Sequence, residues 1–408
     1  MTDRLFRFLE RRWREAVVLG LLLRLAAVLA TPVFPLVDNT WDATFYHEVA
    51  LSLAQGAGYT FDGNPTALFP PGYALALSAP YSWFGSEARA GQCLNLAASM
   101  LLLLFAARLA FRLSGASAAK RTAAWLALDP TQIVMPAFLM SETLCAAWLA
   151  AALLAVVQAR DHGSRWLFAG LFLVAAGFTR GHAFLVVPAV VLVWWWRHEL
   201  SARRAVPGLL VMAVLTLVAV GGWAARNDRV LGAPVLLATN SGMNLLLGNN
   251  ENARGGRADP PGGLPVTGDE VQDEKLSRQR ALEYMRTHPG RTLLFVPVKA
   301  ARLLLPAPVV TYRAELREKW GSLAAGVTLG VAQAVFWLGW VLLWTGRRRI
   351  PSAARLLVVA ALGAWILGHL PFLGGARYFF PVSFLVVLAA ALGSVSARAP
   401  LSSPTKAA

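Results

Sequence analysis

Carboxylates gather in one short stretch near the N-terminus, DNTWDATFYHEVALSLAQG, which covers residues 38–56. Asp38, Asp42 and Glu48 lie in it, directly after an apolar segment at 16–36 that is long enough to cross a membrane. A carboxylate just outside a membrane span can take a proton from an incoming hydroxyl, or it can simply stabilise the start of a helix through the helix dipole. For Asp42 both interpretations are open at this point.

An amphipathic helix is predicted from residue 41 onward. Its apolar side chains recur every four residues, at Trp41, Phe45, Val49 and Leu53. This spacing is typical of a helix that lies along a membrane surface. Asn39 or Thr40 is expected to cap the helix, which places Asp42 in its first turn, with Tyr46 one turn further on.

Basic residues that could bind an anion are predicted at the same side of the membrane. Arg180 lies in the middle of a predicted hairpin of two short spans, Arg226 ends a span, and Arg377 lies between the last two spans. Lys299 lies in an apolar stretch interrupted by prolines. Guanidinium groups bind phosphate strongly, although long basic side chains also extend to the membrane interface for purely structural reasons.

Further polar candidates each have a structural interpretation beside the functional one. Glu142 could hold a cation or the acceptor, or serve as a first-turn helix acid. His182 could contact a sugar, or be a hydrogen-bonded histidine of the hairpin. Asn244 and Asn249 carry amides suited to sugar hydroxyls, and they also suit turns. Glu48 and Tyr46 complete the set of candidate substrate-binding residues.

The elements that must position these residues are membrane helices. Of the 408 residues, 57% are hydrophobic and 15% are charged, whereas soluble domains are about 45 to 50% apolar and about 25% charged. The sequence therefore predicts an all-α polytopic membrane protein with about ten membrane spans, and ten to twelve as the range. The ten predicted spans are 16–36, 91–112, 122–138, 140–158, 166–179, 183–197, 206–225, 323–345, 353–372 and 378–396.

The basic residues predict how the spans are oriented. The formal net charge is +16, and most of it is arginine in short loops that alternate along the chain. Residues 1–14 add a basic amphipathic segment. Positively charged loops face the cytoplasm, so both termini are expected there, in what we take to be a bacterial inner membrane.

Two stretches are too polar to span and are expected on the outer side, at 37–90 and at 226–320. We therefore divide the chain into an N-terminal membrane module at 1–225, an extracytoplasmic segment at 226–320 and a C-terminal membrane part at 321–408. Within the second stretch, 269–290 has good helix termini. Residues 291–308 are predicted to form an interfacial helix, with an eleventh span as the less favoured alternative.

The composition argues against several other classes of function. Basic loops between spans are a topology signal, so nucleic-acid binding is not expected. The two cysteines, Cys93 and Cys145, lie within apolar runs, which argues against a disulfide. The six histidines show no spacing typical of zinc ligands, so no metal site is predicted from them.

The first outer loop resembles that of GT-C superfamily glycosyltransferases that use polyprenyl-phosphate sugars, including protein O-mannosyltransferases and aminoarabinose transferases. In these families an Asp begins a surface helix of the form D-x-x-x-Y, which Asp42 and Tyr46 match. Four further motifs also resemble segments of bacterial members, namely MSETLCAAWL, GFTRGHAFLVVPAVVL, GGWAARNDRVLGAPVLLATNSGMNLLLGNN and GGARYFFPVSFLVVLAAAL.

The resemblance implies a GT-C fold, with Asp42 as catalytic base for inverting transfer of a sugar from a polyprenyl-phosphate carrier. The acceptor would be a lipid, a glycan or a protein outside the cytoplasm. Ala43 stands where members with an acidic pair have a second carboxylate, and the Glu-Lys of the aminoarabinose enzymes is absent. A divalent cation is consequently left open. The alternatives are an envelope glycan ligase or polymerase, and a transporter or lipid flippase.

Overall fold

The structure, a computed structural model, describes residues 2–31, 41–85 and 88–395. Its elements are helices, apart from one small hairpin in which β1 (Thr60–Phe61) pairs antiparallel with β2 (Asn64–Pro65). The predicted all-α class is confirmed. Asp38, Asn39 and Thr40, which were expected to lead into the first surface helix, lie outside the described residues.

Six helical segments in the described ranges are long and apolar enough to cross a membrane, or seven if one bent helix pair counts as a single span. They involve α5 (Ala88–Leu128), α7 (Glu142–Ala159), α10 (Ala202–Leu231), α15 (Ser322–Gly346), α16 (Ser352–His369) and α17 (Phe380–Ser394). Three further helices match predicted spans in position: α2 (Trp13–Ala30), and the shorter α8 (Arg165–Thr179) and α9 (Ala183–Trp196). The predicted count of about ten spans stays a prediction.

One predicted pair of spans differs from the structure. The segment at 91–112 and the first part of the segment at 122–138 belong to one long stretch, α5, whose backbone breaks at Ser114 and Gly115. The second segment ends at Leu128 because Pro130 follows, and a proline disfavours helical backbone in the residue before it. The chain continues instead as α6 (Pro130–Val134) and a 3-10 turn, η1 (Met135–Ala137).

The core of the bundle is built around α7 and α17. In their most apolar windows, 89% and 83% of the residues are buried, against 17% in α10 and α15. Small residues let a peripheral helix approach α17 closely, as where Gly346 of α15 meets Gly393 of α17. The peripheral helices α2, α10 and α15 expose apolar side chains, which suits contact with lipid.

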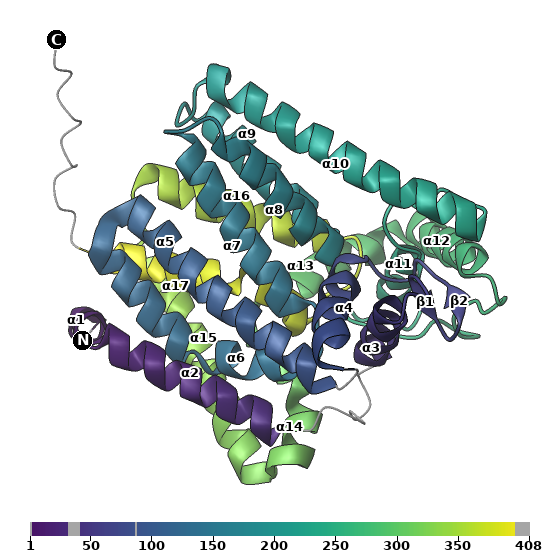
Figure 1. Cartoon of the computed structure of the whole chain (residues 1–408), viewed down its shortest axis with the longest axis horizontal. Helices are drawn as coiled ribbons and strands as arrows, with labels where there is room; N and C mark the ends of the chain where they lie inside the picture. Colours follow the sequence, from purple (N-terminus) through teal and green to yellow (C-terminus); the bar gives the residue numbers. More distant parts are fainter. Residues whose placement is uncertain (1, 32–40, 86–87, 396–408) are drawn as a thin grey trace.

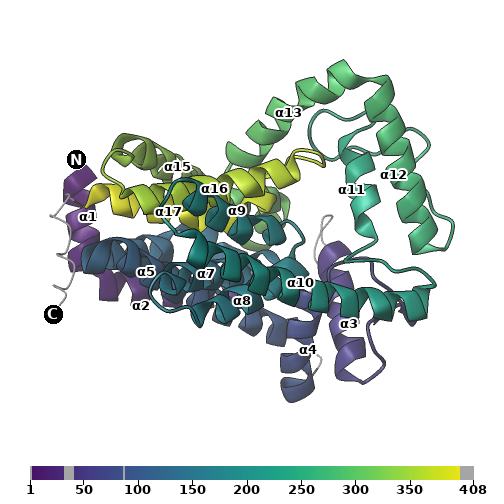
Figure 2. The same ribbon diagram turned by 90° about the horizontal axis from the view of Figure 1, so that it is seen from above.

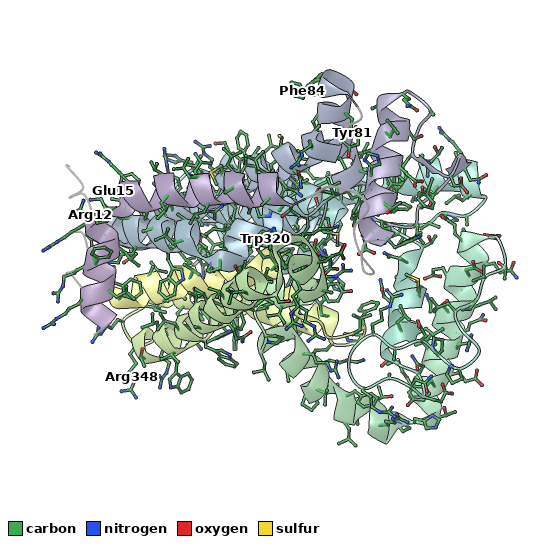
Figure 3. All side chains as sticks on the ribbon, turned by 90° about the horizontal axis from the view of Figure 1, so that it is seen from below. Arg12, Glu15, Tyr81, Phe84, Trp320 and Arg348 are labelled. Carbon is green, nitrogen blue, oxygen red and sulfur yellow. The ribbon has the colours of Figure 1, made fainter. Side chains whose placement is uncertain are left out.

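The two ends of the bundle carry different elements. At one end lies α1 (Thr2–Arg11), where Arg121 of α5 donates to Glu10 of α1 at 2.7 Å and to the carbonyl of Ser394 of α17. The labelled Arg12, Glu15 and Arg348 lie at this end (Figure 3). The opposite end carries α3 (Trp41–Ala54), the β hairpin, α11 (Asn240–Gly248) and α12 (Glu270–Thr287) (Figures 1 and 2).

The segment at 226–320 contributes several elements to that second end. The helix predicted at 269–290 is confirmed as α12, where the Asp269 side chain caps the N-terminus by accepting from the backbone N–H groups of Val271 and Gln272. After it, α13 (Pro289–Leu304) meets a second part, η2 (Pro308–Tyr312) with α14 (Arg313–Trp320), at an angle of 89°. That pair suits a broken span or a re-entrant loop, so its place relative to the membrane stays a prediction.

Candidate active site

The helix that carries Asp42 is anchored by aromatic packing. Phe45 is fully buried, with its ring centroid 4.9 Å from that of Phe69 and 5.0 Å from that of Phe61. Tyr46 packs edge to face against Tyr73 of α4 (Gly72–Phe84), with the ring centroids 4.8 Å apart. These contacts hold α3 so that Asp42, in its first turn, lines a cavity.

Asp42 is ion-paired with an arginine from the far end of the chain. Nη2 of Arg377 donates to Oδ2 of Asp42 at 2.6 Å, and both side chains retain some exposure, 17% for the arginine and 20% for the aspartate. Arg377 comes from the 3-10 turn η3 (Ala376–Phe379), where its backbone N–H donates to Oγ1 of Thr311 at 3.2 Å. A hydrogen bond from Trp365 Nε1 to the carbonyl of Tyr378 holds the same turn.

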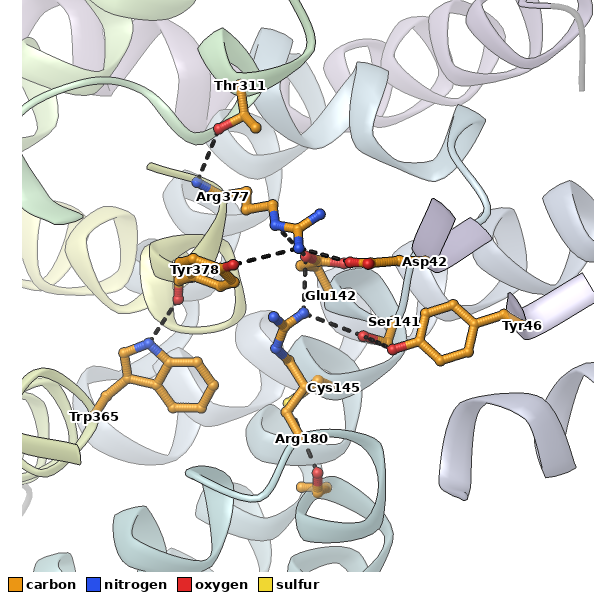
Figure 4. Close-up of polar contacts among 11 residues, drawn as sticks. Asp42, Tyr46, Ser141, Glu142, Cys145, Arg180, Thr311, Trp365, Arg377 and Tyr378 are labelled. Atoms are coloured by element: carbon orange, nitrogen blue, oxygen red, sulfur yellow. Dashed lines mark hydrogen bonds and ion pairs between the residues drawn. The ribbon is translucent and has the colours of Figure 1, made fainter. Parts of the chain in front are cut away.

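Glu142 links this pair to a second arginine. Its side chain is fully buried at the start of α7, with Oε1 at 2.8 Å from Nη1 of Arg180 and at 4.0 Å from Nε of Arg377. Arg180 lies at the break between α8 and α9, and it also donates to Oγ of Ser141. Two carboxylates and two guanidinium groups thus alternate in one network without formal net charge (Figure 4).

The electrostatics of this network keep its donors protonated. Burial by itself lowers the pKa of Arg180, but the Glu142 carboxylate raises it, and the net shift is upward. Burial raises the pKa of the Tyr46 hydroxyl, and Asp42 raises it further. Tyr46 therefore remains a hydrogen-bond donor, and in the structure its hydroxyl lies 3.4 Å from Oγ of Ser141.

The network forms one wall of a cavity of about 770 Å³. A second wall is apolar and consists of the loop at 233–238 together with Leu185 and Phe372. A third wall, from α11 and α12, is polar and includes Asn244, Glu274 and Lys275. The cavity can accordingly hold a molecule that has both a charged group and an apolar chain.

Six of the residues predicted to bind substrate or catalyse line this cavity: Asp42, Tyr46, Arg180, His182, Asn244 and Arg377. Glu142 lies behind the cavity surface and contacts it through the two arginines. His182 stacks on His369 with the ring centroids 3.9 Å apart. Burial lowers the pKa of His182 to about 4, and the nearby Arg180 lowers it in the same direction.

Four other predicted residues lie outside the cavity lining. Arg226 donates to the backbone carbonyls of Thr66 and Tyr59, both at 2.7 Å, and so holds the β hairpin against α10. Lys299 is buried and donates to Oδ1 of Asn249 at 2.8 Å. Glu48 is half-buried on α3 and is not among the residues that line the cavity. The substrate-binding roles predicted for these residues stay predictions.

Some cavity residues were not singled out from the sequence. Tyr378 has its ring 5.4 Å from the guanidinium carbon of Arg180 and 5.0 Å from that of Arg377. Ser141 accepts from Arg180, and His369 stacks on His182. Tyr378 and Ser141 directly adjoin Arg377 and Glu142 in the sequence, and this adjacency was the available signal.

A divalent cation does not fit this network. No cluster of three or more His, Cys, Asp or Glu side chains suited to a metal occurs within the described ranges. The position between the Asp42 and Glu142 carboxylates is taken by the guanidinium of Arg377. The guanidinium groups of Arg377 and Arg180 together already balance the two acids, so no step of the chemistry is assigned to a metal.

Comparison with known proteins finds similarity at the level of solved structures. No family model and no curated protein matches the chain. The chain is similar to two membrane transferases. One is ArnT, the aminoarabinose transferase, from Cupriavidus metallidurans, bound to undecaprenyl phosphate, with 15% identity, a TM-score of 0.46, and coverage of 93% of this chain and 76% of that one.

The other is the oligosaccharyltransferase AglB from Archaeoglobus fulgidus, in complex with an inhibitory peptide and a dolichol-phosphate. Identity is 13% and the TM-score is 0.48, over 93% of this chain and 50% of AglB. The chain thus spans about half the length of AglB. The aminoarabinose transferases and the wider GT-C group, named above as a resemblance, are represented among these neighbours.

Proposed function

We propose that this protein is an integral membrane glycosyltransferase that moves a sugar from a polyprenyl-phosphate carrier to a hydroxyl acceptor on the extracytoplasmic side of a bacterial inner membrane. The observation that carries the proposal is that Asp42, Arg180 and Arg377 share one cavity with an apolar wall. A carboxylate, two phosphate-binding cations and a lipid-compatible surface are the groups that this reaction needs.

The donor would place its phosphate against the two arginines and its prenyl chain along the apolar wall. Guanidinium groups bind phosphate oxygens through paired N–H donors, and the stabilisation is larger in a site partly shielded from water. Tyr46 and Tyr378 lie beside the arginines and can donate hydrogen bonds to phosphate or sugar oxygens. Asn244 of α11 lines the same cavity and supplies an amide of the kind that binds sugar hydroxyls.

The chemical step would be a single displacement with inversion at the anomeric carbon. The acceptor oxygen forms a bond to that carbon while its proton moves to a carboxylate oxygen of Asp42. The bond between the anomeric carbon and the phosphate oxygen breaks, and its electron pair leaves on the phosphate. Arg180 and Arg377 stabilise the added negative charge of the leaving phosphate.

Charge balance supports this assignment. The four-residue network has no formal net charge in the resting protein, because two acids face two arginines. During transfer the leaving phosphate gains a negative charge and Asp42 loses one by accepting the proton. The total charge in the cavity is therefore unchanged, which matters because a net charge in a poorly solvated site is costly.

The test is transfer by purified protein in liposomes, using polyprenyl-phosphate hexoses and pentoses with a labelled sugar and an envelope lipid extract as acceptor. The proposal predicts labelled product together with unlabelled polyprenyl monophosphate. Transfer only from polyprenyl-diphosphate glycans, with release of the diphosphate, would indicate an envelope ligase or polymerase instead. Movement of intact donor across the bilayer without transfer would indicate a flippase.

A further inference from the structure

The guanidinium of Arg377 has two carboxylate partners that hold it in different ways. Glu142 is completely buried and faces Nε, on the side of the guanidinium nearest the backbone. Asp42 lines the cavity and accepts from Nη2, at the tip of the side chain. An anion that enters the cavity can reach the Nη2 end of the guanidinium, where Asp42 is bound. It cannot reach the buried Glu142.

We infer that Asp42 and the donor phosphate compete for the same guanidinium tip of Arg377, so that binding of the donor releases the base. This inference rests on the proposed function. In the resting protein the Asp42 carboxylate oxygen Oδ2 is occupied by Arg377. When the phosphate takes over Nη2, Oδ2 becomes available for the acceptor proton.

The surroundings of Arg377 allow this exchange without moving its backbone. The backbone N–H of Arg377 donates a hydrogen bond to Thr311, and the backbone carbonyl of Tyr378 accepts one from Trp365. The guanidinium also lies over the ring of Tyr378, at 5.0 Å from its centroid. With these contacts and Glu142 in place, a small rotation of the side chain is sufficient to change the partner of Nη2.

The second arginine cannot make the same exchange. Arg180 forms an ion pair with the buried Glu142 and donates a hydrogen bond to Ser141. Among the described residues, the ion-pair partner of Asp42 is Arg377 and not Arg180. Arg180 therefore offers the phosphate a fixed contact, whereas Arg377 offers one that is exchanged for Asp42. The consequence is an order of events, in which the donor binds first and the acceptor is deprotonated only afterwards.

The experiment measures binding of geranylgeranyl monophosphate, without any sugar transfer, to purified protein by calorimetry. Asp42→Asn removes the competing charge but keeps the shape of the side chain. It is expected to bind the phosphate about fivefold to tenfold more tightly than the unmodified protein, which is the range of about 1 to 1.4 kcal/mol. Glu283→Gln is the matched control, because it removes an exposed acid of α12 that does not line the cavity, and it should leave affinity unchanged.

A double-mutant cycle separates exchange from simple repulsion between Asp42 and the phosphate. In the Arg377→Met background, Asp42→Asn should no longer tighten binding, because no guanidinium is left to release. Arg377→Gln serves if the methionine variant does not purify as a monodisperse protein. An equal gain in both backgrounds, or no gain in either, would overturn the exchange.

The same experiment tests the proposed function separately from the exchange. If the unmodified protein binds geranylgeranyl monophosphate no better than geranylgeraniol, the phosphate-binding role of the cavity is wrong, and the exchange that rests on it is wrong as well. If the unmodified protein prefers the phosphate and the cycle shows no coupling, the function stands and only the exchange is rejected.

Discussion

Arg377 donates a hydrogen bond to Asp42 at 2.6 Å, although 335 residues separate the two in the chain. The pair joins α3 to the turn η3 that precedes α17. It places the proposed base in direct contact with a proposed phosphate-binding cation.

Asp42→Asn should abolish sugar transfer while leaving the fold intact. The amide keeps the side-chain volume and can still contact Arg377, but it cannot accept the acceptor proton. General-base catalysis typically contributes about 100-fold to 10,000-fold, so a loss of this size is expected in kcat. Transfer of labelled sugar measures it, with Glu283→Gln, an exposed acid outside the cavity lining, as the control that should retain activity. Retention of most of the activity by Asp42→Asn would exclude Asp42 as the base.

Glu142→Gln should destabilise the protein. The Glu142 carboxylate is fully buried and lies 2.8 Å from Arg180, so its removal leaves a buried guanidinium without its counter-charge. Breaking a buried ion pair costs about 3 to 5 kcal/mol. Thermal unfolding in detergent should show a clearly lower Tm than for Glu48→Gln. A Tm equal to that of the control would mean that the network tolerates the loss and that Glu142 is not its anchor.

Gly248→Ala should disturb the cavity from a distance. A Cβ at this position would lie 2.0 Å from the carbonyl oxygen of Phe372, so the segment at 371–375 must shift, and this segment leads directly to Arg377. Overpacking of this kind costs about 1 to 3 kcal/mol. Affinity for the donor should fall together with stability.

Gly363→Ala is the control for that substitution, because the space around a Cβ at Gly363 is open and the position is helical. It should leave binding unchanged. Equal effects of the two alanine substitutions on donor affinity would contradict the role assigned to the contact between α11 and residue 372.

Acid should destabilise the protein partly through His182. Its pKa is lowered to about 4 in the folded protein, against about 6.5 in an unfolded chain. Between these values the unfolded state binds the proton and the folded state does not, so stability falls as the pH falls through about 6.5. The contribution amounts to about 2 kcal/mol between about pH 7.5 and about pH 5.

The measurement is the difference in Tm between those two pH values for the unmodified protein and for His182→Gln. The variant should lose less stability on acidification, because it lacks the group that takes up the proton. An unchanged pH dependence would mean that other groups carry the acid sensitivity.

The prediction from sequence was most reliable where the signal is local. Apolar spans, and a capped polar helix such as the one that follows Asp269, can be predicted from residues that are neighbours in the sequence. The apolar runs must form helices because the backbone has to satisfy its own hydrogen bonds wherever water is excluded. It was less reliable at the segment at 122–138, where apolar composition continued past Leu128 but Asp129-Pro130 ended the helix.

Two arginines illustrate the limit of sequence reasoning about the site. Arg226 and Arg377 look alike in the sequence, as basic residues next to predicted spans. In the structure Arg226 holds backbone carbonyls of the β hairpin, whereas Arg377 faces the cavity and Asp42. Which role a cation takes depends on the acceptors that other segments bring within reach of its side chain.

The sequence by itself determined that this is a helical membrane protein with an acid in the first turn of the helix that follows the first apolar segment, because hydrophobic length and helical periodicity are properties of contiguous residues. Only the tertiary structure decided that Asp42, Glu142, Arg180 and Arg377 form one network on one cavity. These charges come from four separate segments, and they meet because unpaired charges in a poorly solvated interior are costly, so the packing of the helices must bring each of them to a partner.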